Sequence, residues 1–468
     1  MEKASLSSRK FRIEKDSIGE VKVPFNVYYG SFTTRALENF HISNIKAPAA
    51  FKKSLALIKK AAAITNEGLQ VLDSKKSKAI QKAADELIEG AFNEDFQLDI
   101  FQAGAGTPFH MNTNEILANR ANEILGGKKG TYEFVHPNNH VNMSQSSNDV
   151  IPTAIRLTML LLAPSLIKSG KNLTSALQKK SKEFKKILKT GRTHLQDAVP
   201  VTLGQEFASF KTAITKDLKE IESAMKNLQE LGIGGTALGT GINTHPEFQK
   251  KIVKNLGKLT KLKLTPTKNL FETTSNMNAF LKLSSSYRML ATTLQRIAED
   301  LKLLGMSVLN EIFLPDVEPG SSIMPGKINP SVPECLQMIA YQVIGNDTAV
   351  ALACQKGQLE LNVMTPLILK NLTESTEILT SGMHMFQVFC IEEIQPNKER
   401  CQELLEKSNC VITALSPHLG YAKTAELMKE ALKRKIPIEK LCEEKKVLPK
   451  EKLREILDAG SLTAPRRT

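Results

Sequence analysis

Apolar residues recur every three or four positions along the middle of the chain, which is the spacing of one face of an α-helix. One such stripe runs from Leu203 to Leu228, another runs from Phe280 to Leu304, and a shorter one covers 173–188. Each stripe covers only one face of its helix, and that face has to be buried against other helices. The pattern therefore predicts a bundle of long helices and favours association of subunits through them into a closed symmetric oligomer.

The regions on either side of the long stripes have a different pattern. Gly, Pro and Asn gather at 101–114 and 138–148, which is typical of loops. A break at 395–397 precedes another set of short helical stretches. The sequence therefore predicts a mainly α fold with three domains. They are an N-terminal mixed, mostly helical domain at 1–146, a central long-helix bundle at 147–396 and a small C-terminal helical domain at 397–468.

Composition agrees with a helical, globular protein. The 468 residues include no Trp and only 5% aromatic residues, which disfavours a large β-sandwich or barrel core. Lys and Arg outnumber Asp and Glu by 63 to 49, and the simplest interpretation is a Lys-rich solvated surface. Such a charge also helps to attract a dianionic substrate. The sequence has neither a clustered basic run nor a nucleic-acid-binding motif, so we expect no nucleic-acid partner.

Cysteine usage and hydropathy indicate a cytoplasmic protein. The six cysteines lie in the C-terminal half without a CxxC pair, so we expect reduced thiols rather than disulfides or a zinc site. The first ten residues lack the apolar segment of a signal peptide. The richest apolar stretch, Leu157 to Ile167, is too short to span a bilayer and is interrupted by Pro164. We therefore expect no membrane-spanning helix.

Four polar segments interrupt the helical pattern and carry groups that bind carboxylates. In Gln102–Thr107, small residues allow backbone N–H groups to approach an anion, although a plain loop has the same composition. In Ser144–Asp149, hydroxyl and amide groups precede a predicted helix, where they form either a carboxylate site or a helix N-cap. The third segment, Gly191–Asp197, holds His194 next to Thr193, a candidate acid, base or amine contact.

The fourth segment, Gly320–Pro330, combines two hydroxyls, an ammonium and an amide between Gly and Pro residues. That combination suits a substrate with two carboxylates. The Gly-rich stretch 232–241 matches no phosphate-binding motif, and we do not interpret it as a nucleotide site. No group of His, Cys or acidic residues has metal-ligand spacing, so we predict no metal site.

Gly320 to Pro330 closely resembles GSSxMPxKxNP, the hallmark loop of the aspartase/fumarase superfamily. The motif is long and specific, and the similarity extends over nearly the whole chain, including the other three polar segments. The resemblance implies a three-domain fold whose central helices form a 20-helix core in a homotetramer. It also implies active sites built from three subunits, a small dicarboxylate as substrate, and catalysis without a cofactor.

The resemblance also assigns roles to residues of all four segments. Ser321 resembles the general base that removes the Cβ proton, a role that requires backbone N–H groups and Lys327 to favour its ionised form. The residues that resemble the contacts to the β-carboxylate, and so to the aci-carboxylate formed on deprotonation, are Thr107, Ser146 and Ser147. Those that resemble the α-carboxylate anchors are Lys327 and Asn329. Those that resemble contacts to the leaving group are Asn148, Thr193 and His194, with Glu334 orienting the histidine.

Two branches of the superfamily differ at some of these positions. Gln102–Thr107, Asn329–Glu334 and Gly357–Met364 resemble the aspartase form, whereas Ser146-Ser147-Asn148 resembles the fumarase form. The balance favours L-aspartate as substrate, converted reversibly to fumarate and ammonia by anti β-elimination through a carbanion. The alternatives are dehydration of L-malate, as in a fumarate hydratase, and a low-activity homologue with a structural role.

The chain also departs from the usual pattern of the superfamily. Gly305–Val308 stands where most members carry SGPR, and the connection there is a few residues shorter. Pro108 and His110 replace a usual Ser and Asn, and Asn139 replaces a common Asp. We expect these changes to affect substrate preference or activity.

Overall fold

The computed structural model describes residues 10–465, and helices dominate it, as the sequence predicted. The chain forms two compact units. Unit 1 comprises Met1–Leu166, Lys219–Met289 and Gln342–Ile378, and unit 2 comprises Ile167–Leu218, Leu290–Tyr341 and Leu379–Thr468. The division into three domains at 146 and 396 stays a prediction. The interpretation of the N-terminal segment falls largely on 1–9, outside the described residues.

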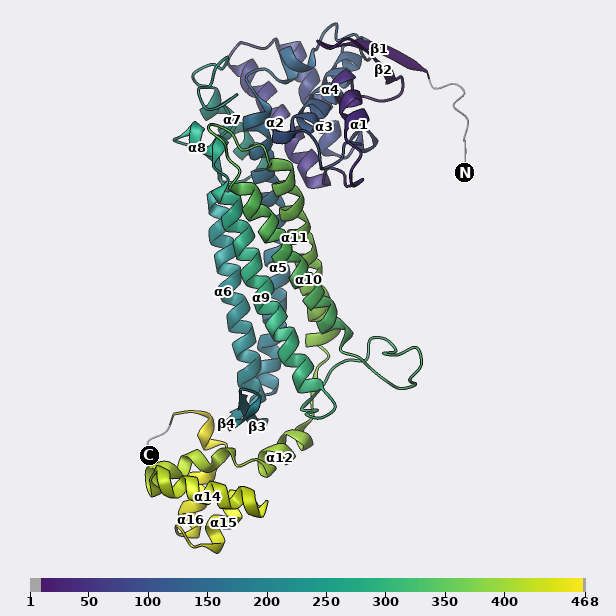
Figure 1. Ribbon diagram of the computed structural model, residues 1–468. Helices are drawn as coiled ribbons and strands as arrows, with labels where there is room; N and C mark the ends of the chain where they lie inside the picture. Colours follow the sequence, from purple (N-terminus) through teal and green to yellow (C-terminus); the bar gives the residue numbers. More distant parts are fainter. Residues whose placement is uncertain (1–9, 466–468) are drawn as a thin grey trace. The chain divides into compact units, whose positions relative to one another are not determined.

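Unit 1 begins with a β-hairpin and continues into helices that enclose an apolar core. The antiparallel strands are β1 (Phe11–Lys15) and β2 (Glu20–Pro24). The shorter helices of this unit, labelled in Figure 1, are α1 (Ser31–Asn39), α2 (Ala49–Gly68), α3 (Ser74–Ile88), α4 (Thr107–Ile124), α7 (Phe248–Thr260) and α8 (Leu270–Ser275). Ala, Leu and Ile side chains of α2, α3 and α4 form most of the core. Two short parallel strands, β5 (Glu230–Leu231) and β6 (Thr265–Pro266), complete the unit.

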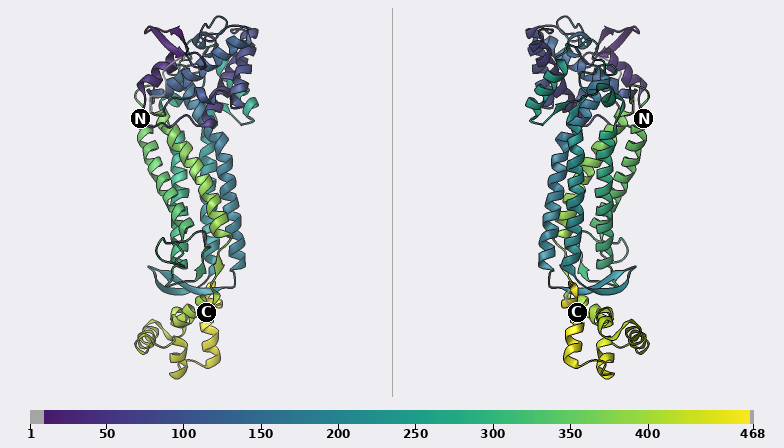
Figure 2. Two further views of the ribbon diagram at one scale, coloured as in Figure 1. Left: turned by 90° about the vertical axis from the view of Figure 1, so that its right-hand side faces the viewer. Right: turned by 90° about the vertical axis from the view of Figure 1, so that its left-hand side faces the viewer.

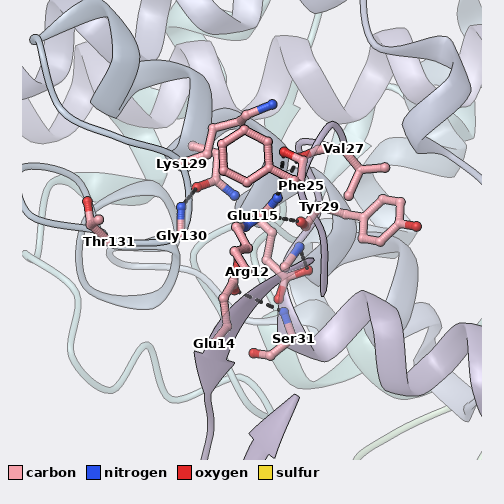
Figure 3. Close-up of polar contacts among 12 residues, drawn as sticks. Arg12, Glu14, Phe25, Val27, Tyr29, Ser31, Glu115, Lys129, Gly130 and Thr131 are labelled. Atoms are coloured by element: carbon pink, nitrogen blue, oxygen red, sulfur yellow. Dashed lines mark hydrogen bonds and ion pairs between the residues drawn. The ribbon is translucent and has the colours of Figure 1, made fainter. Parts of the chain in front are cut away.

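A buried polar network fastens the hairpin to α1 and α4 (Figure 3). Arg12 of β1 pairs with Glu14 at 2.8 Å and also donates to backbone carbonyl groups at the end of β2 and in the segment that follows it. The Glu115 carboxylate of α4 accepts hydrogen bonds from backbone N–H groups at the start of α1, at Gly30, Phe32 and Thr33. Burial raises the pKa of Glu115 to about 7, although these donors favour the ionised form.

Five long helices confirm the predicted bundle. They are α5 (Ser147–Glu183), α6 (Leu203–Leu228), α9 (Asn278–Gly305), α10 (Ser331–Cys354) and α11 (Thr365–Phe386). Within unit 1 they pack side by side (Figure 1), and the hydroxyls of Thr376 on α11 and Tyr287 on α9 hydrogen bond at 3.1 Å. Within unit 2, the Gln337 amide of α10 donates to Glu299 of α9 at 2.7 Å. The apolar stripes predicted for α6 and α9 are buried.

One of these helices, α5, bears on the prediction that the chain has no membrane-spanning helix. By length and composition alone, α5 contains an 18-residue window apolar enough to cross a bilayer. However, 78% of that window is buried inside the protein. A core helix of a bundle passes the same test, because its apolar residues face other helices rather than lipid.

Unit 2 contains a β-hairpin and a group of short C-terminal helices. The hairpin strands are β3 (Leu188–Thr193) and β4 (Gln196–Thr202), and the pair β7 (Ile312–Phe313) and β8 (Gln395–Pro396) lies elsewhere in the unit. The C-terminal helices, yellow-green to yellow in Figure 2, are α12 (Lys398–Lys407), α13 (Ser416–Leu419), α14 (Tyr421–Arg434), α15 (Ile438–Glu444) and α16 (Lys450–Leu457). They enclose a separate apolar core.

Candidate active site

The four predicted segments lie at the ends of helices and strands, and each of the two units contains two of them. Unit 1 holds Gln102–Thr107 at the start of α4 and Ser144–Asp149 at the start of α5. Unit 2 holds Gly191–Asp197 at the tip of the β3–β4 hairpin and Gly320–Pro330 just before α10. Unit 1 thus places two of the four segments beside each other, and unit 2 contains the other two.

In unit 1, the turn before Thr107 packs closely against two neighbouring parts of the chain. The Ala105 N–H donates to the Val363 carbonyl at 2.7 Å. A Cβ on Gly104 would lie 2.8 Å from the Cβ of Val363, and a Cβ on Gly106 would lie 3.2 Å from a side-chain carbon of Ile151 on α5. Since only glycine permits such approaches, the small residues of the motif set the position of Thr107 beside the first turns of α5.

The start of α5 shows the helix N-cap, one of the two roles that the sequence left open, and the carboxylate site stays a prediction. Asp149 acts as a helix-terminal partner, because its carboxylate accepts a hydrogen bond from the Ser146 N–H at 2.9 Å. The Ser146 and Ser147 side chains are only half-buried, so they remain available to a ligand. The Asn148 amide instead donates to the Ala237 carbonyl at 2.6 Å, which links it to the Gly-rich stretch 232–241.

That Gly-rich stretch has a structural role that the sequence did not reveal. The second oxygen of Asp149 accepts hydrogen bonds from the N–H groups of Gly234 at 2.9 Å and Thr236 at 3.0 Å. Burial raises the pKa of Asp149 to about 6, while the N–H donors and the ammonium of Lys59 oppose this shift. The stretch therefore binds a carboxylate of its own chain instead of a phosphate.

In unit 2, Thr193 and His194 lie exposed at the tip of the hairpin. His194 and Leu195 both have a positive φ, 53° and 59°, as a two-residue hairpin turn requires. Histidine adopts this conformation more often than most residues, whereas leucine rarely does. The backbone strain at Leu195 is therefore about 1–3 kcal/mol. The sequence predicted the site but not the hairpin that presents it.

The loop Gly320–Pro330 is closed on itself by hydrogen bonds. The Asn329 amide donates to the Gly320 carbonyl at 2.6 Å, and the Gly320 N–H donates to the Lys327 carbonyl at 2.8 Å. The Ser321 Oγ accepts hydrogen bonds from the N–H groups of Ile323 at 3.2 Å and Met324 at 2.9 Å. Two N–H donors on one hydroxyl oxygen favour its ionised form, as a serine base requires.

Glu334 lies in the first turn of α10 and is exposed. Within the described residues of this chain, it forms no hydrogen bond with His194. The predicted orientation of His194 by Glu334 therefore stays a prediction that one chain by itself does not test. Among residues 10–465, no three His, Cys, Asp or Glu side chains come close enough together to hold a metal ion.

A buried ion-pair network supports the hairpin that carries His194. Lys189 of β3 pairs with Glu206 at 2.9 Å and with Glu311 at 3.2 Å. A pocket of ≈ 460 Å³ lies beside this network, and its lining includes Met306 and Val308 of the connection that replaces SGPR. The departure from the family pattern therefore changes the surroundings of the hairpin's anchor and leaves the Gly320–Pro330 loop intact.

Comparison with known proteins shows the family of this chain. The family model described as "Lyase" matches residues 19–345, and the model described as "Fumarase C C-terminus" matches 411–464. The chain is 43% identical to an aspartate ammonia-lyase of Bacillus subtilis over 98% of this chain and 97% of that protein. It is 40% identical to a class II fumarate hydratase of Helicobacter pylori, covering 98% of this chain and 100% of that protein.

A solved structure is similarly close. The crystal structure of a class II fumarase from Schistosoma mansoni superposes with a TM-score of 0.96 at 38% identity, over 98% of this chain and 100% of that one. The long-helix fold and the Ser321 loop thus define a lyase. The chain belongs to the aspartase/fumarase superfamily.

Proposed function

We propose that this protein is an aspartate ammonia-lyase, which converts L-aspartate reversibly to fumarate and ammonia. The observation that carries the proposal is the hydrogen bonding of Ser321, whose Oγ accepts from the N–H groups of Ile323 and Met324. A serine held in this way can serve as the base in a β-elimination. Full-length relatives named aspartate ammonia-lyase, 42% to 45% identical, support aspartate as the substrate.

In the proposed mechanism, Ser321 removes a proton from Cβ of aspartate, and ammonia then leaves from Cα on the opposite face. The intermediate is an aci-carboxylate with two negative charges. Hydroxyl donors stabilise it, because they are fixed before the charge develops. These donors are Thr107, Ser146 and Ser147. Lys327 and Asn329 hold the α-carboxylate, and Asn148, Thr193 and His194, with Glu334 behind it, contact the amino group.

The proposal includes a homotetramer in which three subunits contribute to each active site. Two observations support it. The predicted residues are divided between unit 1 and unit 2 of the chain, and Thr193, His194 and Lys327 are exposed in the isolated chain. Exposed catalytic groups at a hairpin tip and on a loop need further surfaces to exclude water from the reaction.

A second candidate is fumarate hydratase, in which the leaving group is a hydroxyl. The sequence Ser146-Ser147-Asn148 at the start of α5 favours it, since this is the form found in the fumarase branch. The 40% identity to a class II fumarate hydratase is only slightly lower than that to the aspartate ammonia-lyases. A measurement on both substrates has to decide between the two reactions.

The test is to supply the purified protein with L-aspartate or L-malate and to follow the ultraviolet absorbance of fumarate. Fumarate from aspartate alone supports the proposal, and fumarate from malate alone replaces it with the second candidate. Activity on neither substrate would indicate a low-activity homologue. Sedimentation of the same sample measures the oligomeric state, and a monomer would contradict the shared active site.

A Ser321→Ala variant tests the base. It should lose nearly all turnover while it still binds substrate, as measured by calorimetric titration. Ser175→Ala is a suitable control, because Ser175 is an exposed serine on α5 whose hydroxyl bonds only to the carbonyl of Lys171. If Ser321→Ala retained turnover, Ser321 would not be the base.

A further inference from the structure

A buried lysine lies behind the start of α5. Lys59 lies on α2 and has no exposed surface. Helix α2 contains none of the four predicted segments. Its Nζ lies 2.5 Å from Nε2 of His110, 2.9 Å from Oε1 of Gln145 and 3.3 Å from Oδ1 of Asn142. A buried charge without partners is costly, so this set of contacts requires an explanation.

The two amide groups present their oxygens to Lys59. The Gln145 NH₂ group donates to the carbonyls of Val141 and Met143, and the Asn142 NH₂ group faces the Gln145 carbonyl. The amide oxygens are therefore left to face Nζ and can only accept hydrogen bonds. With the His110 nitrogen, Nζ has three neighbours, which matches the three N–H groups of an ammonium. Burial lowers the pKa of Lys59 well below its ordinary value, and the carboxylate of Asp149 opposes this shift. The acceptor oxygens of Gln145 and Asn142 beside Nζ also favour the charged form.

The charge on Lys59 decides which nitrogen of His110 carries the proton. Burial, together with the Lys59 charge, keeps the pKa of His110 well below its ordinary value, so the ring is neutral and has one N–H. If Nε2 accepts a hydrogen bond from the ammonium, the proton has to be on Nδ1. Nδ1 lies 2.8 Å from Oγ of Ser147, so His110 donates to that hydroxyl.

The direction of this last bond determines what Ser147 can offer a ligand. A hydroxyl group has one proton to donate. When the Ser147 Oγ accepts a hydrogen bond from His110, that proton is not used in the bond to His110. The proton is then free to point toward a carboxylate. If the bonds ran the other way, Ser147 would donate to His110 and would present only lone pairs, which repel a carboxylate.

We propose that Lys59 and His110 are positioning residues: the buried ammonium fixes the tautomer of His110, and His110 fixes Ser147 as a hydrogen-bond donor to the substrate carboxylate. The inference rests on the proposed function, in which Ser147 contacts the carboxylate that becomes the aci-carboxylate. It adds two buried residues of α2 and α4 that do not touch the substrate. It also gives a role to His110, one of the departures from the family pattern.

The kinetic test compares two substitutions of His110. His110→Asn keeps an NH₂ donor near the position of Nδ1, so it should stay near the kcat/KM of the native protein. His110→Phe removes the donor and should lower kcat/KM about tenfold, the effect of one lost hydrogen bond. It should also weaken binding of succinate, an unreactive dicarboxylate, by a similar factor. Equal values for the native protein and His110→Phe would overturn the proposal.

A matched control is available in the same unit. Lys76 of α3 also lies next to a histidine, with its Nζ 3.2 Å from Nε2 of His140, but neither residue contacts Ser147. Lys76→Met should leave kcat/KM and succinate binding unchanged, whereas Lys59→Met should weaken both. If the two lysine variants behaved alike, the effect of Lys59 would not be specific.

A spectroscopic test does not depend on turnover. In native protein labelled with ¹⁵N in its histidine rings, solid-state NMR distinguishes the Nδ1–H from the Nε2–H tautomer, and His110→Asn identifies the signal. We expect Nδ1–H, the less common form in water. The Nε2–H form would overturn the inference. If neither aspartate nor malate reacts, the proposed function fails, while the tautomer and succinate binding still decide this inference.

Discussion

The Arg192 guanidinium and the Glu311 carboxylate form an ion pair at 3.0 Å, and the Glu311 side chain has no exposed surface. The same carboxylate lies 3.2 Å from Nζ of Lys189, whose side chain is 1% exposed. Arg192 directly precedes the turn with Thr193 and His194, while Glu311 directly precedes β7 on the connection toward the Ser321 loop. The ion pair therefore joins the hairpin that carries Thr193 and His194 to the connection that leads to the Ser321 loop.

Substitution of this carboxylate should destabilise the protein. Glu311→Gln leaves the buried Lys189 and the partly buried Arg192 with one negative partner fewer. Removal of one member of a buried pair costs about 3–5 kcal/mol. We expect a lower midpoint of unfolding in urea and a lower kcat, because the hairpin turn with His194 loses its anchor.

The control for this prediction is an exposed carboxylate that, like Glu311, pairs with one arginine and one lysine. Glu403 pairs with Arg400 at 2.8 Å and with Lys407, and its side chain is 43% exposed. Exposed pairs contribute only about 0–1 kcal/mol. Glu403→Gln should therefore change the urea midpoint little. Similar losses in both variants would mean that burial of Glu311 has no special importance.

The close approach of Gly104 to Val363 leads to a second prediction. A Cβ at position 104 would lie 2.8 Å from the Cβ of Val363, so Gly104→Ala forces the turn before Thr107 to move. Overpacking of this kind costs about 1–3 kcal/mol. Because the displacement reaches Thr107, we expect a KM raised several-fold in a steady-state assay of the active substrate.

Gly68→Ala is the matched control for Gly104→Ala. Gly68 ends α2, and a Cβ there would meet nothing within 4 Å. Since alanine favours helix over glycine by about 1 kcal/mol, this variant should keep the native KM and unfold no earlier than the native protein. An unchanged KM in Gly104→Ala as well would show that the turn tolerates a methyl group.

The sequence predicted the long helices well because each one carries its own signal. The apolar stripe from Leu203 to Leu228 has the same ends as α6, and the stripe from Phe280 to Leu304 lies inside α9. The positions of a stripe depend only on residues a few places apart, so no knowledge of the rest of the chain is needed. The Gly320–Pro330 loop was found because its motif is also local.

Features that depend on residues far apart in the sequence could not be predicted. The burial of Lys59 is one example, because His110 and Gln145, which allow it, lie 51 and 86 residues away. The partner of Gly234 is likewise Asp149, 85 residues earlier. The β3–β4 hairpin lacks an alternating apolar pattern, and its strands contain Gly191 and Pro200.

The last prediction concerns the network of Figure 3 and the dependence of stability on pH. Burial raises the pKa of Glu115 in the folded protein to about 7, above the ordinary value of 4.5, and the Thr33, Gly30 and Phe32 donors only partly offset this. The folded state therefore binds this proton more tightly than the unfolded state. The resulting stabilisation is complete below pH 4.5 and is lost as the pH rises through 7.

Between pH 5 and pH 7, this difference amounts to about 2 kcal/mol. Glu115→Gln resembles the protonated carboxyl group and does not titrate, so its contribution should stay constant over that range. Urea unfolding of both proteins at the two pH values measures the change. Relative to the native protein, we expect Glu115→Gln to gain stability on going from pH 5 to pH 7. The comparison cancels the contributions of groups common to both proteins, including Asp149. A constant difference between the two proteins would mean that Glu115 is already ionised in the folded state at pH 5, held by the N–H groups at the start of α1.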